Sequence, residues 1–73
     1  MRYHPRILTG EKNGHIAAIE NDNGDVWEIH PLGDRKEREF YSLPAAEQLA
    51  TAHAEIATRR GTHEGIGSLR PVL

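Results

Sequence analysis

Histidine is the residue type that first suggests chemistry in this sequence, because imidazole binds metal ions and moves protons near neutral pH. The five histidines are His4, His15, His30, His53 and His63. They are spread through the chain, and no two have the short spacing of a ligand doublet such as His-x-x-x-His. The sequence therefore predicts no metal site.

Nucleophilic catalysis finds no better support in the residue pattern. The chain has no cysteine, and Ser42 and Ser68 lie outside any Gly-x-Ser-x-Gly elbow. The glycine-rich segment 61–67 lacks the Gly-Lys-Ser/Thr ending of a phosphate loop. A core this small can hardly enclose a pocket that excludes water. We therefore expect a protein that is not an enzyme, with no catalytic residues and no cofactor.

Composition is typical of one small globular domain. The chain has 73 residues, of which 37% are hydrophobic and 27% charged, and its net charge is −2. Such a charge gives no general attraction to nucleic acid or to anionic lipid. The absence of cysteine and of any apolar run near 20 residues indicates a cytoplasmic protein, and we expect a monomer.

The first part of the chain has the pattern of antiparallel strands. Asn13-Gly14 predicts a type I′ hairpin turn, and residues 21–24 repeat this turn chemistry. Loops of two or four residues would place one set of side chains on the core face: Ile7, Thr9, Ile16, Ala18, Trp27 and Ile29. The other face would carry Leu8, Ala17, Ile19, Val26, Glu28 and His30. After Pro31, a charged loop is expected to lead into a short edge strand at Phe40 and Tyr41.

A helix is predicted from Leu43 to Arg60, which contains no glycine and many alanines. Ser42 suits its N-cap, Pro44 its first turn and Gly61 its C-terminal end. A stripe facing the sheet is expected from Leu43, Ala46, Leu49, Ala50, His53, Ile56 and Ala57. Glu55 and Arg59 are spaced for an ion pair on the outer side.

These elements predict an α+β fold: a three- to four-stranded antiparallel β-meander with one C-terminal α-helix packed on one face. Residues 1–61 form the domain, and residues 62–73 are expected to form a flexible C-terminal tail, because their apolar residues have no periodicity.

Charge placement favours protein binding over nucleic-acid binding. The start of the chain is basic and aromatic, whereas the second hairpin is acidic at Glu20, Asp22, Asp25 and Glu28. Acid at the tip of a sheet would repel DNA. Trp27 is interpreted as a core residue. The expected contact residues are Arg2, Tyr3, His4, Arg6, Arg35 and Arg38.

In length and in its sheet-plus-helix plan, with Arg2-Tyr3-His4-Pro5-Arg6 as a contact segment, the chain resembles small phage-encoded regulators of host bacterial RNA polymerase. That resemblance implies binding to a larger complex, with inhibition of transcription initiation or antitermination. Phage inhibitors of host defence nucleases have a similar size. The order of elements also resembles the DNA-binding arm domains of phage integrases, although the basic sheet that those domains use is missing.

Overall fold

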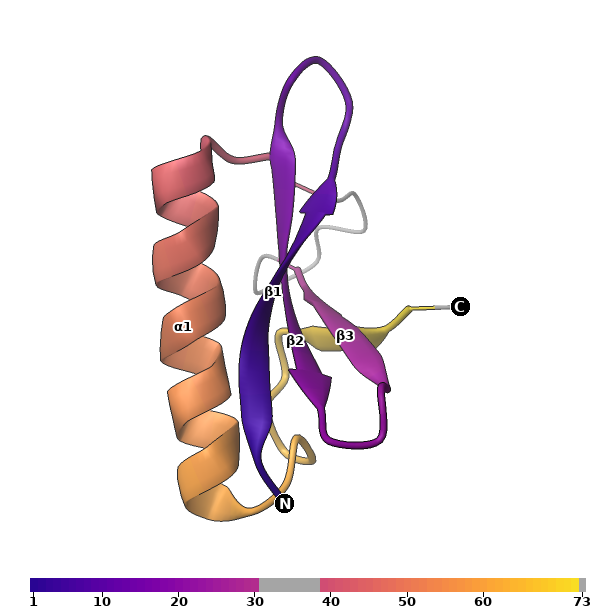
Figure 1. The fold of residues 1–73 in the computed structure, drawn as a ribbon, viewed down its shortest axis with the longest axis vertical. Coiled ribbons are helices and arrows are strands. Elements are labelled where there is room, and N and C mark those ends of the chain that lie inside the picture. The colour runs from indigo at the N-terminus through magenta and orange to yellow at the C-terminus, as the bar shows by residue number, and fades with distance from the viewer. Residues whose placement is uncertain (31–38, 73) are drawn as a thin grey trace.

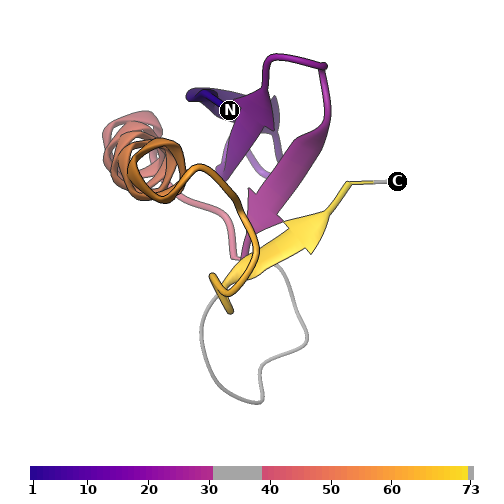
Figure 2. The same cartoon turned by 90° about the horizontal axis from the view of Figure 1, so that it is seen from below.

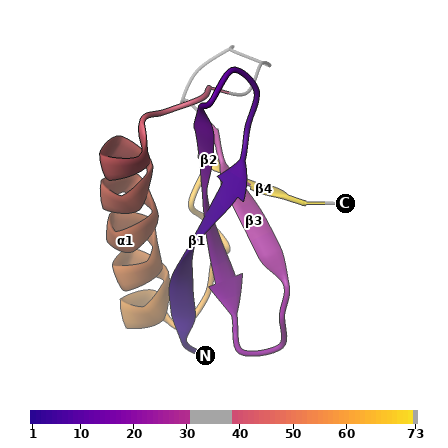
Figure 3. The same cartoon turned by 45° about the horizontal axis from the view of Figure 1, so that its top comes forward.

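The computed structural model describes residues 1–30 and 39–72, so the expected contact residues Arg35 and Arg38 lie outside the described residues. The described part contains a four-stranded antiparallel sheet and one helix (Figure 1). The strands are β1 (Tyr3–Thr9), β2 (His15–Asn21), β3 (Val26–Ile29) and β4 (Leu69–Pro71), in that order across the sheet, and the helix is α1 (Leu43–Arg60). Helix α1 lies along one face of the sheet (Figure 2, Figure 3). The predicted α+β architecture is confirmed.

The β1–β2 turn forms one residue earlier than Asn13-Gly14 predicts. Lys12 and Asn13 have positive φ angles of 53° and 63°, and the Gly14 N–H donates to the Glu11 carbonyl over 2.9 Å. Two central residues with positive φ are the requirement of a type I′ turn. Gly14 is needed for another reason, because a Cβ there would lie 2.6 Å from the Phe40 Cβ.

The β2–β3 turn is held by the side chain of Asn21. Its Oδ1 accepts hydrogen bonds from the backbone N–H groups of Asn23, at 3.0 Å, and Asp25, at 2.9 Å. Gly24 has a φ of 86°, which an L side chain adopts only with strain. The side chain of Asn21 is buried, so the backbone N–H groups of the turn are hydrogen-bonded from the interior of the fold.

The predicted face of β2 is wrong, because an odd number of residues, five, separates Thr9 from its partner His15 and Glu20 from its partner Val26. Ile7 is opposite Ala17 in β2, and Ile19 is opposite Trp27 in β3. A one-residue shift of register moves every side chain of a strand to the other face. Ala17 and Ile19 therefore face the helix, not Ile16 and Ala18. The second odd separation reverses the first, so β3 keeps its predicted face.

Helix α1 begins and ends at the predicted residues and contacts the sheet through alanines. The buried helix residues are Ala46, Ala50, Ala54 and Ala57. Leu43 and Ile56, which the predicted stripe included, are 44% and 43% exposed. Alanine lets the helix approach the sheet closely, and the larger side chains of the sheet fill the space.

The ends of α1 agree with the sequence only in part. Gly61 has the left-handed φ of 77° expected at a helix end, and its N–H donates to the Thr58 carbonyl. Ser42 precedes the helix with an extended backbone, but its side chain makes no capping hydrogen bond. Among residues 1–30 and 39–72, no helix has the length and apolar character needed to cross a membrane.

The predicted tail is wrong where residues Leu69–Pro71 form β4. The Val72 N–H donates to the Val26 carbonyl over 3.0 Å, and the His30 N–H donates to the Ser68 carbonyl over 2.7 Å. Leu69 is buried against the core. The fourth strand thus comes from this segment. Tyr41, expected in an edge strand, instead makes a single bridge with His15.

Candidate functional site

The alternation of side chains along β1 separates the residues expected to form one contact segment. Tyr3 faces the helix and is 6% exposed, so it belongs to the core. His4 and Arg6, which alternate along β1 with Tyr3 and Pro5, are exposed on the opposite face. An intact contact made by Tyr3, His4 and Arg6 together is therefore not available.

Tyr3 is part of a three-ring cluster. The His63 ring stacks on Trp27 with a centroid distance of 4.0 Å, and the Tyr3 and Trp27 ring centroids are 5.8 Å apart. The backbone N–H of His63 donates to the Tyr3 hydroxyl over 3.0 Å. Trp27 is 9% exposed, which confirms its interpretation as a core residue. His63, which the sequence placed in the tail, closes this end of the core.

His4 and Arg6 are matched by acids of the second hairpin. The His4 Nε2 lies 3.1 Å from the Asp22 Oδ1, and the Arg6 guanidinium pairs with the Glu20 carboxylate. The hydrogen bond from His4 is the largest cause that lowers the pKa of Asp22, and the backbone N–H and charge of Arg2 add to it. The basic start and the acidic hairpin therefore neutralise one another.

His53 and Ser68 are close enough to suggest a base and a nucleophile. The His53 Nδ1 lies 2.9 Å from the Leu49 carbonyl oxygen, so Nδ1 carries the proton, and Nε2 lies 3.0 Å from the Ser68 Oγ. Ser68, however, is 7% exposed and lies next to β4. This hydrogen bond holds the start of β4 against the helix, which is a structural role.

A second contact of a histidine is that of His30, whose Nε2 lies 2.9 Å from the Oε2 of the buried Glu28. No group of three or more His, Cys, Asp or Glu residues is placed to hold a metal ion in the described ranges. No buried side-chain nitrogen or oxygen there lacks a hydrogen-bond partner. Polar groups inside the described fold are thus engaged in holding it together.

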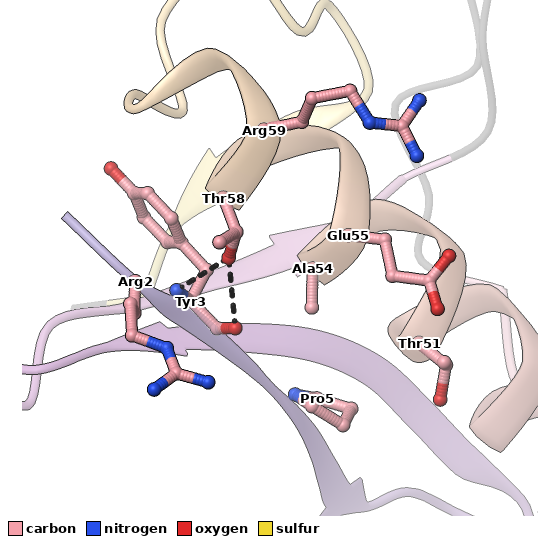
Figure 4. Close-up of a pocket in the computed structure, with 8 residues that line it drawn as sticks. All are labelled: Arg2, Tyr3, Pro5, Thr51, Ala54, Glu55, Thr58 and Arg59. Carbon is pink, nitrogen blue, oxygen red and sulfur yellow. Dashed lines mark hydrogen bonds between the residues drawn. The ribbon is translucent and has the colours of Figure 1, made fainter.

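An open groove runs between the edge strand β1 and the C-terminal half of α1. It has a volume of about 480 Å³ and is drawn in Figure 4. The lining residues are Arg2, Tyr3, Pro5, Thr51, Ala54, Glu55, Thr58 and Arg59. The Thr58 hydroxyl accepts the Tyr3 N–H over 2.8 Å and donates to the Tyr3 carbonyl over 3.2 Å. These two bonds fasten β1 to the helix at one end of the groove.

Arg2 and Arg59 differ from the other described arginines. Their guanidinium groups have no hydrogen bond or ion pair with a described residue, and the expected Glu55–Arg59 pair does not form. By contrast, Arg6 pairs with Glu20, and Arg60 and Arg70 donate to backbone carbonyls. Both Arg2 and Arg59 line the same groove.

Sequence reasoning found Arg2 but missed the helical wall of the groove. The sequence assigns Arg59 to an ion pair with Glu55 on the outer side of the helix. The pattern of α1 distinguishes a buried from an exposed side, but it does not tell which flank lies beside the sheet edge. Comparisons with protein-family models, curated proteins and solved structures found no match for this chain, so the candidate site rests on the geometry of the groove.

Proposed function

We propose that this chain is a non-enzymatic regulator that binds a larger protein through the groove between β1 and α1. The observation that carries the proposal is that Arg2 and Arg59, whose guanidinium groups make no hydrogen bond or ion pair with a described residue, line one open groove. Arginine is enriched in protein interfaces, and groups that the fold itself does not use are available to a partner.

The opposite face of the sheet supports protein over DNA as the partner. The DNA-binding alternative needs a sheet face rich in Lys and Arg. On that face the described residues carry Arg6 and Arg70, but also the acids Glu20 and Glu28, with Asp22 at the adjoining turn. Arg6 is already paired with Glu20. This distribution offers little net attraction for phosphates.

The proposed partner is a large host complex, and bacterial RNA polymerase is the first to test, as the resemblance implies. Binding there would inhibit initiation or promote antitermination. A host defence nuclease is the second candidate partner. In either case Arg2 supplies a contact, while Tyr3 supports the groove from the core and does not reach the surface as an anchor.

A groove-filling substitution tests the proposal. Thr51 is exposed and lines the groove, so Thr51→Trp should fill it without disturbing the core. Ala52 is also exposed but is absent from the groove lining, which makes Ala52→Trp the matched control. Binding of purified bacterial RNA polymerase to the immobilised chain would be measured by biolayer interferometry. We expect Thr51→Trp to weaken binding about tenfold or more and Ala52→Trp to bind as the wild type does.

The other possible results of this experiment distinguish between RNA polymerase, a defence nuclease and DNA as the partner. Equal polymerase binding by both variants would exclude the groove as the contact. No polymerase binding, together with Thr51-dependent binding of a defence nuclease, would select the nuclease inhibitor. Tight retention on heparin at low salt that Thr51→Trp does not alter would favour the DNA-binding alternative.

A further inference from the structure

We infer, resting on the proposed function, that the β1–α1 groove takes a short, extended, acidic segment of the partner, held through its carboxylates by Arg2 and Arg59 and not by strand addition to β1.

The free edge of β1 is closed to a further strand along this groove. In an antiparallel pair, alternate residues turn both backbone groups away from the partner strand. Tyr3 is such a residue, because its N–H and carbonyl both bond to Thr58. By the same alternation Pro5 also turns outward, and proline has no N–H to donate. An added strand would thus find two successive outward positions blocked.

Side chains must therefore supply the recognition, and the groove offers arginines. Arg2 extends from the strand wall and Arg59 from the helix wall (Figure 4). A guanidinium forms its strongest hydrogen bonds with carboxylates, often in pairs. Because successive side chains of an extended chain point to opposite sides, two adjacent acidic residues could address the two walls.

The length of the groove limits the segment. Its helical wall runs from Thr51 to Arg59, which is about 12 Å along a helix axis. An extended chain covers that distance with about four residues. Pro5 and Ala54 also line the groove, which suits small apolar side chains on either side of the acids.

Nucleic acid is the less favoured occupant, although phosphates also bind arginine. Glu55 lines the same groove, and Asp22 is close enough to Arg2 for Arg2 to lower its pKa. A polyanion would meet these carboxylates together with the net charge of −2, whereas a short peptide with two acids can place them on the arginines alone.

Peptide titration of the full chain tests the inference. The probes are a capped six-residue peptide with adjacent Asp and Glu between pairs of alanines, its Asn-Gln counterpart, and a single-stranded DNA hexamer. Binding would be followed by amide chemical shifts of the ¹⁵N-labelled protein. We expect the acidic peptide to shift the amides of residues 2–4 and 51–59, and the Asn-Gln peptide to bind about tenfold more weakly or less.

Three variants test which arginines bind the carboxylates of the peptide. Arg2→Gln and Arg59→Gln should each weaken binding of the acidic peptide about tenfold, and added salt should weaken wild-type binding. Arg60→Gln is the matched control, because Arg60 is the next arginine of the same helix and does not line the groove. Arg2, Arg59 and Arg60 are all exposed, so circular dichroism should show each variant folded.

Equal binding of the Asn-Gln peptide would overturn the inference and leave the proposed function standing, since the groove would still hold a protein segment. Tighter groove binding of the DNA hexamer, or no binding of either peptide at millimolar concentration, would also overturn it. The proposed function fails separately, when Thr51→Trp does not affect the binding of any protein partner.

Discussion

The two faces of β1 have opposite tasks. On the helix side, Tyr3 is fixed by the Thr58 hydroxyl, the His63 amide and the Trp27 ring. On the other side, His4 and Arg6 are exposed and pair with acids of the neighbouring hairpin. Five consecutive residues that look like one basic aromatic patch therefore divide into a structural row and a surface row. Strand alternation, and not composition, decides which residues remain available to a partner.

Among the substitutions on the two faces of β1, removal of the Tyr3 side chain should reduce the free energy of unfolding the most. Tyr3→Ala deletes a buried ring that packs on Trp27, and we expect a loss of about 3–5 kcal/mol in the free energy of unfolding. The sequence alone predicts almost no change, because it treats Tyr3 as a surface anchor. Urea unfolding followed by tryptophan fluorescence measures the difference. His4→Ala is the control from the other face, and an equal loss in both variants would contradict the division.

Substitution of Thr58 tests whether its hydroxyl holds the backbone of β1 against the helix. Thr58→Val keeps the shape of the side chain but leaves the Tyr3 N–H and carbonyl without their partner, which should cost about 1–3 kcal/mol. Thr51→Val, about two helical turns earlier on the same wall of the groove and exposed, should be nearly neutral. Thermal unfolding followed by circular dichroism compares them, and equal melting temperatures would show that the hydroxyl does not secure the strand.

The ion pair on the opposite face should contribute much less. Arg6 and Glu20 are 50% and 29% exposed at their side chains, so a double-mutant cycle with Arg6→Gln and Glu20→Gln should give a coupling of about 0.2–1 kcal/mol. The coupling should shrink as salt is added. A coupling as large as the Thr58 effect would mean that the outer face stabilises β1 as strongly as the core face does.

The smallest expected effect is the pH dependence of the Asp22 contact. The hydrogen bond from His4 lowers the pKa of Asp22 below 3.8, so the contact stabilises the fold above that value. This stabilisation is lost as the pH falls through the lower folded-state pKa. NMR titration of the Asp22 carboxyl should show the lowered pKa, and His4→Ala should raise it towards 3.8. An unchanged pKa in His4→Ala would show that the contact is absent in solution.

Local signals predicted the helix better than the sheet. The absence of glycine from Leu43 to Arg60, and of proline after Pro44, with Gly61 after the helix, was sufficient because helical hydrogen bonds join residues close in sequence. The register of β2 depends on loop lengths that the turn residues do not specify uniquely. Asn13-Gly14 favours one turn, but the chain turns at Lys12-Asn13, where the Phe40 side chain leaves no room for a Cβ on Gly14.

Contacts between distant segments also explain why the sequence predicted only part of the candidate site. Arg2 was identified as a contact residue because its charge is visible in the sequence. Arg59 and Thr58 were not, because their role comes from lying beside a strand more than fifty residues earlier in the chain. β4 was missed for a similar reason: its hydrogen bonds to β3 hold a segment that has no strand pattern of its own.

By itself, the sequence determined where the helix begins and ends, that strands precede it, and that charge of both signs covers the chain, because these properties depend on neighbouring residues. Only the tertiary structure decided which face of each strand is buried, that Tyr3 and His63 close the core, and that Arg2 and Arg59 share a groove. Those outcomes depend on the register of loops and on contacts between distant segments, which are settled when the sheet and helix pack together.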